Sequence, residues 1–352
     1  MTLDNKSAEP DAESPPRRKP RLWVLITPFA LIVLALALYG AYWLVARSRL
    51  EAGIENRAEG LRQAGYQTSV EGLRIDGFPF RMRVAFKQVR VGAPSGWAAE
   101  APGLKAEAYL HDLGHWVIVA PEGLTVTRPK GGTLAVRGQA LRASIAGVNR
   151  APWRITIEGS KLAFTPGPGA LPFSFATMDS LTLGLRPAPD GGADGEAGLQ
   201  ITGGKAAPQT VLWRLANDRP VAATLDARVV KPAAFKGKSW AEAVRAWTDG
   251  GGQVQLLKAE MQGGVTSLWA KSGTLSVGSD GRVSGSAPLE LRQGVQGLTA
   301  LAGAPLDETA ARSAAAVAAA RDSGGTASLN LVFQAGVVTL GPVQIGPSPK
   351  IY

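Results

Sequence analysis

The stretch LWVLITPFALIVLALALYGAYWLVA, residues 22–46, divides the chain into two very unequal parts. It contains no charged residue, and as a helix that rises about 1.5 Å per residue it would be about 37 Å long. That length is sufficient to cross the hydrocarbon core of a bilayer, which is about 30 Å thick. We therefore predict a transmembrane helix over residues 22–46, with a short segment before it and the bulk of the chain after it.

Basic residues on the two flanks of this helix favour one orientation. Four of them lie within residues 17–21, whereas Arg47 and Arg49 follow the helix. Because basic flanks stay on the cytoplasmic side, we expect the N-terminus in the cytoplasm and the bulk of the chain exported. A cleaved signal peptide is the alternative, but its apolar region is normally about 7–15 residues long. Three aromatic residues within residues 39–43 also resemble the aromatic belt at a membrane interface.

The composition excludes several classes of function. The chain has 352 residues, no cysteine and a formal net charge of +10. The absence of cysteine excludes disulfides, thiolate nucleophiles and cysteine-bound metals, and it suits an oxidising compartment. The positive charge serves either general solubility or attraction to anionic lipid headgroups and envelope polymers. No basic run with interleaved aromatic residues is present, so we expect no nucleic-acid partner.

The segments on either side of the transmembrane helix differ in character. Residues 1–21 are polar and predict a disordered cytoplasmic tail. Residues 47–65, RSRLEAGIENRAEGLRQAG, predict a stalk helix, because Leu50, Ile54 and Leu61 share one face at helical spacing. Gly65 suits the end of that helix. We expect residues 66–352 to form a periplasmic β-rich domain.

Apolar and polar residues alternate in many short segments of this domain. Such segments are typical of strands with one apolar and one polar face, and the Gly- and Pro-rich stretches between them are typical of turns. The predicted fold class is mainly β (α+β), with a long antiparallel, curved or groove-like sheet; a closed sandwich or barrel is the alternative. The clearest segments are MRVAF (82–86), WRITIEG (153–159), LTLGLR (181–186) and SLNLVF (328–333).

Two helical insertions interrupt the predicted strands. In the first, near residues 239–248, Ser239 and Glu242 form a capping box at the start of a helix. The second, near residues 292–322, is rich in alanine, which favours a helix but offers little to bury. One face of the first helix is a candidate surface for a protein partner. Its residues are Trp240, Val244 and Trp247.

The motif GFPFR, residues 77–81, predicts a corner between two strands. Pro79 fixes its own φ and moves Phe78 towards an extended conformation. The rings of Phe78 and Phe80 then have two alternatives. They pack on the apolar face of the sheet and stiffen the corner, or they form a lip that contacts lipid or a partner.

Residues with catalytic or metal-binding chemistry are few. His111 and His115 have a spacing that would suit zinc on a helix, but the sequence after them is strand-like. We therefore expect no catalytic, cofactor or metal site, and no enzymatic activity. An enzyme that acts on envelope polymers stays as a minor alternative, because carboxylates at a defined separation can cleave glycosidic bonds. The candidate carboxylates are Asp76, Glu107 and Asp226.

The anchor, the stalk, the GFPFR motif and the closing segment GVVTLGPVQIGPSP (336–349) resemble the bacterial domain of unknown function 2125 family. That family has no established activity, so no catalytic residue is carried over. The resemblance implies an envelope protein of Gram-negative bacteria, anchored in the inner membrane and facing the periplasm. The order of one anchor and many glycine-punctuated strands is also similar to AsmA-like envelope proteins, whose apolar-lined β-grooves are linked to lipid traffic and outer-membrane upkeep.

Two non-enzymatic functions follow from these observations. The first is an envelope module whose curved sheet shelters lipid or other apolar chains. The second is a structural or scaffolding protein that binds an envelope protein through its sheet edges or through the helix near residues 239–248.

Overall fold

The computed structural model describes residues 22–147, 153–190, 192–264, 266–292, 326–341 and 343–352. The predicted tail at residues 1–21 lies outside these ranges, as does the second predicted insertion beyond residue 292. The chain divides into two compact units, residues 1–48 and 49–352. Each unit is described by itself.

Helix α1 (Leu22–Gln63) covers both the predicted transmembrane helix and the predicted stalk without a break. Among the described residues it is the one helix that is long and apolar enough to cross a membrane, a test that a signal sequence also meets. Gly65, with φ 85°, ends it as expected, and its amide donates to the carbonyl of Arg62. Within the second unit, the Thr68 hydroxyl donates to the carbonyl of Ala58 at 3.3 Å, which joins the end of α1 to the first strand.

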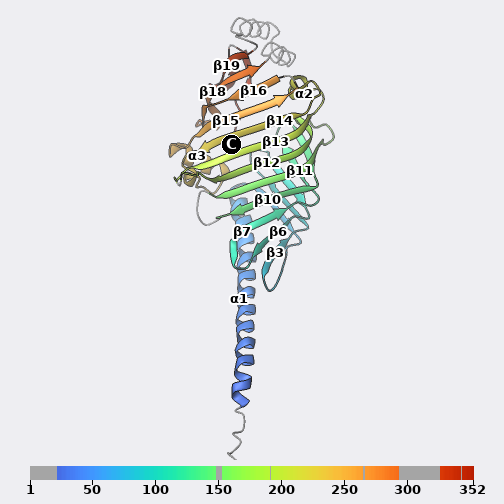
Figure 1. Ribbon diagram of the computed structural model, residues 1–352, viewed down its shortest axis with the longest axis vertical. Coiled ribbons are helices and arrows are strands. Elements are labelled where there is room, and N and C mark those ends of the chain that lie inside the picture. The colour runs from blue at the N-terminus through green and yellow to red at the C-terminus, as the bar shows by residue number, and fades with distance from the viewer. Residues whose placement is uncertain (1–21, 148–152, 191, 265, 293–325, 342) are drawn as a thin grey trace, which may run out of the picture. The chain divides into compact units, whose positions relative to one another are not determined.

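The second unit is dominated by one antiparallel sheet, which has 21 strands within the described residues. The predicted fold class is therefore confirmed. Strands β10–β15 run side by side in Figure 1. The strands are β1 (Gln67–Glu71), β2 (Arg74–Asp76), β3 (Arg81–Ala85), β4 (Gln88–Gly92), β5 (Ala98–Pro102), β6 (Lys105–Tyr109), β7 (Asp112–Val119), β8 (Leu124–Arg128), β9 (Gly132–Arg137), β10 (Ala140–Ala146), β11 (Arg154–Pro166), β12 (Phe175–Pro187), β13 (Gly195–Ala206), β14 (Val221–Val229), β15 (Val254–Gly263), β16 (Thr266–Ala270), β17 (Gly273–Val277), β18 (Val283–Arg292), β19 (Thr326–Gln334), β20 (Val337–Leu340) and β21 (Val343–Pro347).

Strands β1–β10 form two layers, which we call the double-layer region. The chain bends sharply after a strand of one layer and continues as a strand of the other layer. For example, β3 pairs with β6 in one layer, whereas β4, which follows β3 directly, pairs with β5 in the other. Gly72, Gly103 and Gly123 lie at such bends with φ of 63°, 61° and 80°. A left-handed residue lets a strand turn sharply, and glycine adopts that conformation without a Cβ clash. The bends therefore fold the first part of the sheet onto itself.

Strand β11 is where the two layers merge. Its first half pairs with β10 and its second half pairs with β9, while β12 pairs along both halves on the other side. From β11 to β15 the sheet then continues as one layer, which we call the single-layer region. Beyond it, β15 pairs with both β16 and β17, and β18–β21 complete the sheet.

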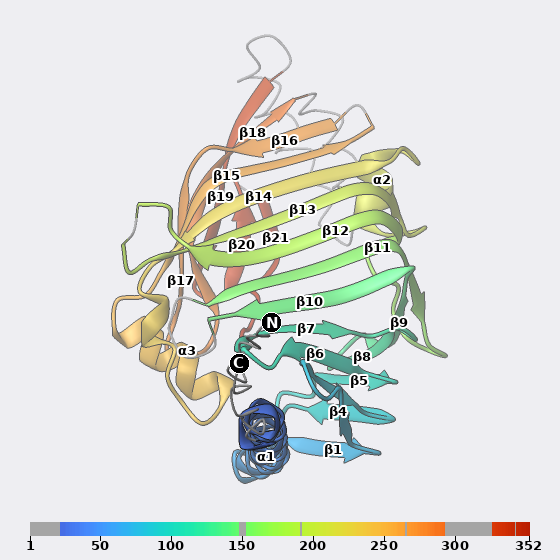
Figure 2. The same cartoon turned by 60° about the horizontal axis from the view of Figure 1, so that its bottom comes forward.

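The buried core follows this layout. In the double-layer region Met82 of β3 is fully buried and Val84 is nearly so. At the junction, Leu134 and Val136 of β9 pack with Ile201 of β13, so β9 lies on the apolar side of the single layer. A separate cluster holds the C-terminal strands together. Figure 2 shows the sheet curling so that β9 and β20–β21 lie on the same side of β12–β14, as bulged and twisted sheets do.

Within its described residues the unit also has three short helices: α2 (Val211–Ala216), η1 (Pro232–Ala234) and α3 (Trp240–Asp249). Helix α3 is the first predicted insertion. Ser239 Oγ accepts from the Glu242 amide at 3.2 Å, and the Glu242 carboxylate accepts from the Lys238 amide at 2.8 Å. The expected capping of this helix is therefore confirmed, with the returning bond one residue earlier than in a standard capping box.

Candidate functional site

The inner face of the single-layer region carries apolar residues in continuous rows across the strands. Residues that are directly paired in an antiparallel sheet point to the same face, so the register defines each row. No charged residue occurs in the three central rows. The rows are Ile155, Leu185, Ala197 and Ala227; Ile157, Leu183, Leu199 and Leu225; and Gly159, Leu181, Ile201 and Ala223.

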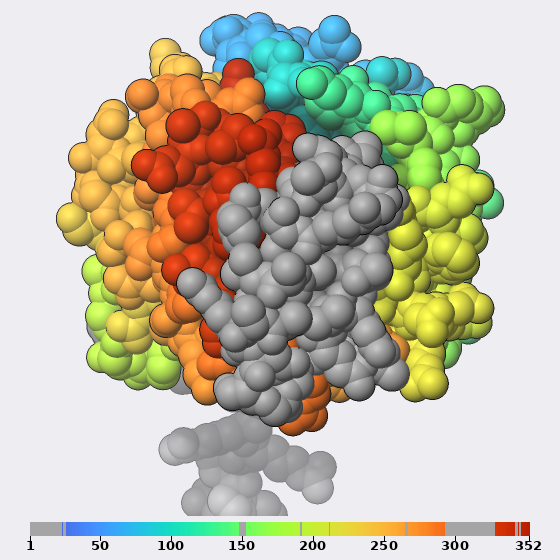
Figure 3. All heavy atoms as spheres, turned by 90° about the horizontal axis from the view of Figure 1, so that it is seen from above, coloured from blue at the N-terminus to red at the C-terminus, as the bar shows by residue number. Residues whose placement is uncertain are grey.

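This apolar face is covered by other strands at one end and is partly exposed to solvent in the middle. Ile201 is buried beneath β9, whereas Leu183, in the centre of the sheet, is 43% exposed. Ile157, Leu199 and Leu225 are half-buried. Seen from above, strands β19–β21 (red) lie near the centre of the view, and the segment that carries α2 (yellow) lies at its right edge (Figure 3). The sheet therefore presents an apolar floor that its described second layer does not cover.

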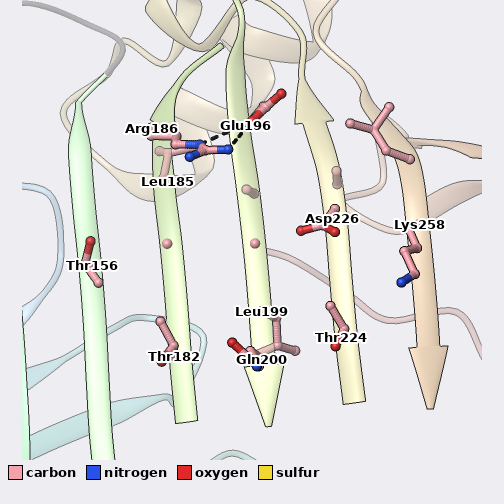
Figure 4. Close-up of a pocket in the computed structure, with 15 residues that line it drawn as sticks. Thr156, Thr182, Leu185, Arg186, Glu196, Leu199, Gln200, Thr224, Asp226 and Lys258 are labelled. Carbon is pink, nitrogen blue, oxygen red and sulfur yellow. Dashed lines mark hydrogen bonds and ion pairs between the residues drawn. The ribbon is translucent and has the colours of Figure 1, made fainter. Parts of the chain in front are cut away.

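The outer face of the same strands is polar. Gly184 and Gly198 are paired on β12 and β13, and they form the floor of a shallow hollow of about 600 Å³. The Arg186 guanidinium lies 3.0 Å from the Glu196 carboxylate at one end of this hollow (Figure 4). The two faces thus differ sharply in chemistry. The other polar residues that line the hollow are Thr156, Thr182, Gln200, Thr224, Asp226 and Lys258.

Two of the three candidate carboxylates come together, and the third does not. Asp76 and Glu107 line one hollow around Arg83, whereas Asp226 lies on β14. Arg83 Nε is 2.9 Å from Asp76 Oδ1, but it is not aligned for a hydrogen bond. Glu107 accepts a hydrogen bond from Arg81 and thereby raises the pKa of that guanidinium. Both carboxylates are therefore held in ion pairs with arginines.

The two histidines lie on a turn and a strand, whereas the sequence indicated that the strand begins after both of them. His111 is in the turn between β6 and β7, and His115 is within β7. His115 Nε2 is 2.9 Å from the Ser144 hydroxyl. Among the described residues, no three metal-ligating side chains gather in one place.

The apolar face of α3 packs inside the unit. Val244 and Trp247 are buried; the Trp247 indole donates to the Val230 carbonyl at 2.7 Å and stacks on Phe235 at 4.6 Å between ring centroids. The prediction of a partner surface made of Trp240, Val244 and Trp247 is therefore wrong for the last two residues. Trp240 is exposed, and for it the prediction stands untested. The physical reason is that an amphipathic helix needs an apolar neighbour, and its own domain supplies one.

The GFPFR motif forms the turn between β2 and β3, so the corner lies where it was expected. Phe78 and Phe80 are 56% and 70% exposed. The expectation that both rings pack on the apolar face of the sheet is therefore wrong. The alternative, a lip around Phe78, Pro79 and Phe80, stays a prediction.

Several floor residues were not singled out from the sequence. Leu199 and Leu225 lie in β13 and β14, whose sequences GLQI and VAATLDA alternate as clearly as LTLGLR does. The available signal was therefore the same alternation, repeated on consecutive strands. This alternation does not give the register between strands, which is what places Leu199 and Leu225 beside Leu183.

Comparison with protein families gives a match over most of the chain. A family model described as "Uncharacterized protein conserved in bacteria (DUF2125)" matches residues 43–349. No curated protein and no solved structure matches the chain. The expected similarity to AsmA-like proteins is thus not shown.

Proposed function

The chain belongs to the DUF2125 family of bacterial proteins, and because the description of that family names no activity, we propose from the geometry that the curved sheet shelters a lipid or another apolar chain. The ligand would lie along the inner face of the single-layer region. The observation that carries this proposal is the uncharged apolar floor centred on Leu183, which is 43% exposed in the middle of a sheet.

The chemistry of the floor suits an acyl chain. Removing apolar surface from water contributes about 25 cal/mol per Å², and this floor offers leucine and isoleucine side chains on four adjacent strands. A ligand with a charged group at its centre would lose solvation there without gaining a partner. The floor therefore favours a long, unsubstituted hydrocarbon over a polar metabolite.

The chain also fits a location next to lipid. Helix α1 supplies one segment that is long and apolar enough to cross a membrane. Our proposal places the N-terminus in the cytoplasm and the sheet in the periplasm, anchored at the inner membrane, because the basic residues before the helix outnumber those after it. The proposed role is non-enzymatic, since Asp76 and Glu107 are held in ion pairs and Asp226 lies apart from them on β14.

The test uses full-length protein purified in detergent. The protein is washed extensively with fresh detergent to remove loosely associated lipid, and the lipids that stay bound are then extracted and quantified by mass spectrometry. Leu199→Arg places a charge on the floor, whereas Gln200→Arg, one residue further along β13, places the same charge on the outer face. We expect co-purified lipid in the wild type and in Gln200→Arg, and at least a fivefold loss in Leu199→Arg. Equal lipid in the two variants would show that the lipid comes from the surroundings of α1.

The alternative is a scaffold that binds an envelope protein, and the exposed Trp240 on α3 favours it. Crosslinking in intact cells separates the two functions. A single protein partner captured in stoichiometric amount, with no lipid on the floor, would replace the lipid proposal.

A further inference from the structure

Exposed aromatic side chains gather at one end of the double-layer region, on two neighbouring turns. Phe78 and Phe80 belong to the turn between β2 and β3, and Tyr109 begins the turn between β6 and β7. They are 56%, 70% and 51% exposed. We call Phe78, Phe80 and Tyr109 the aromatic tip.

The two turns are held together as one surface. The Leu110 amide donates to the Phe80 carbonyl at 3.0 Å, and Arg81 is paired directly with Tyr109 across β3 and β6. The Arg81 guanidinium also lies over the Tyr109 ring, 5.2 Å from its centroid. The three rings are therefore presented by a backbone that is fixed by sheet pairing.

The charges beneath the aromatic tip are largely paired. Asp76 forms ion pairs with Arg74 and Arg83, and Glu107 forms one with Arg81. The arginines thereby offset the two carboxylates that would oppose transfer of the tip towards a bilayer surface. Arginine side chains can also keep their charged ends in the headgroup layer while their stems lie along apolar groups.

The chemistry of this surface matches the interface of a bilayer. A tyrosine ring is typical of the headgroup boundary, because its hydroxyl can stay in water while its ring lies in apolar surroundings, and phenylalanine rings supply the apolar surface that inserts there. The same chain carries α1, which can cross a membrane, and the aromatic tip lies on two turns within the first seven strands that follow it. Because a tether raises the local concentration of the surface near the bilayer, weak insertion is sufficient.

We propose that the aromatic tip inserts into the headgroup region of the phospholipid bilayer that α1 crosses. This insertion is a second membrane contact besides α1, and it does not depend on a ligand at the floor around Leu183. It restricts the rotation and tilt of the sheet above the membrane. A domain held only by a helix would be free to move about its tether.

The absence of cysteine makes a direct test available. A nitroxide is attached to Phe80→Cys in the full chain, which is reconstituted into vesicles of phosphatidylethanolamine and phosphatidylglycerol. Leu171→Cys is the matched control, because Leu171 is 60% exposed and lies on the turn between β11 and β12. Collision rates of each nitroxide with oxygen, which enters the bilayer, and with a nickel chelate, which stays in water, are measured by electron paramagnetic resonance.

We expect the label at Phe80 to be at least threefold less accessible to the nickel chelate than the label at Leu171, and more accessible to oxygen. Equal accessibility to the chelate at both positions would overturn the proposal. An immobilised label at Phe80 that is protected from both reagents would also overturn it, because it would indicate burial against protein. A label at Tyr109→Cys repeats the measurement on the second turn, so that a folding defect at Phe80 leaves the proposal testable.

Discussion

The double-layer region and the single-layer region are built from strands with the same alternation of apolar and polar residues, yet their apolar faces have different environments. In β3, Met82 is 0% exposed, whereas Leu183 in β12 is 43% exposed. The difference lies in the strands opposite them. Where each strand bends and returns, its apolar face is covered by the second layer; where the strands continue as one layer, the same kind of face becomes a floor.

Three of the bends contain a glycine in a left-handed conformation, at Gly72, Gly103 and Gly123. Gly123 has φ 80°, and a Cβ at this position would be 2.3 Å from the Val136 carbonyl oxygen. In the single layer, β12 has no residue with positive φ. Left-handed residues also occur in the single layer, at Lys161 of β11 and Gly203 of β13, so what distinguishes the two regions is that the bent strands of the first return as a second layer.

The largest expected effect is at the core of the double-layer region. Met82→Ala removes a fully buried side chain and should lower the free energy of unfolding by about 2–5 kcal/mol. Leu183→Ala should cost less than about 1 kcal/mol, because the side chain is already partly in water. Urea unfolding of the full chain in mild detergent, followed by tryptophan fluorescence, measures both. Equal losses would mean that the floor at Leu183 is covered and that the two regions do not differ.

A smaller effect is expected at the bends. Gly123→Ala forces a Cβ against the Val136 carbonyl and should cost about 1–3 kcal/mol in unfolding free energy. Gly184→Ala is the control, since the nearest atom to its new Cβ would be 3.9 Å away and its φ is not in the left-handed range. We expect the same urea midpoint for Gly184→Ala as for the wild type, within error. A tolerated Gly123→Ala would show that the bend does not need a left-handed residue.

The smallest effect is expected where the two layers merge. Lys161, between the halves of β11, donates to Asp179 at 2.8 Å, and this hydrogen bond lowers the pKa of Asp179. Because the folded-state pKa is the lower one, the stabilisation is present above the unfolded pKa and is lost as the pH falls through the folded value. Asp179→Asn should remove that loss, measured as a slightly flatter dependence of Tm on pH between about 5 and 3. An unchanged slope would show that the exposed pair contributes nothing there.

The sequence predicted the strands well because alternation is a local property. MRVAF and LTLGLR were both identified as half-apolar strands, and both are strands. Their different burial was not predictable, because it depends on which strands lie opposite: β3 belongs to one of the two layers of the double-layer region, whereas in the single-layer region β9 covers only the end of β11–β13. A local pattern carries no information about such distant partners.

The same limit explains the two corrected surfaces. The spacing of Val244 and Trp247 defined a helix face, but not whether that face meets a partner or the domain itself; it packs on Phe235. The proline in GFPFR predicted the corner, because φ restriction is local. The exposure of Phe80 depends instead on which residues lie next to the aromatic tip in the folded domain. No local sequence pattern carries that information.

The most direct test of the proposed open floor compares two adjacent residues of β12 in living cells. A photoreactive benzoyl-phenylalanine replaces Leu183, which faces the floor, or Thr182, which faces the polar hollow on the outside. After irradiation, the intact mass of the purified protein is measured. We predict adducts with the mass of membrane lipids at position 183 and none at position 182. Equal lipid adducts at both positions, or no lipid adduct at position 183, would contradict the proposal that this sheet shelters apolar chains.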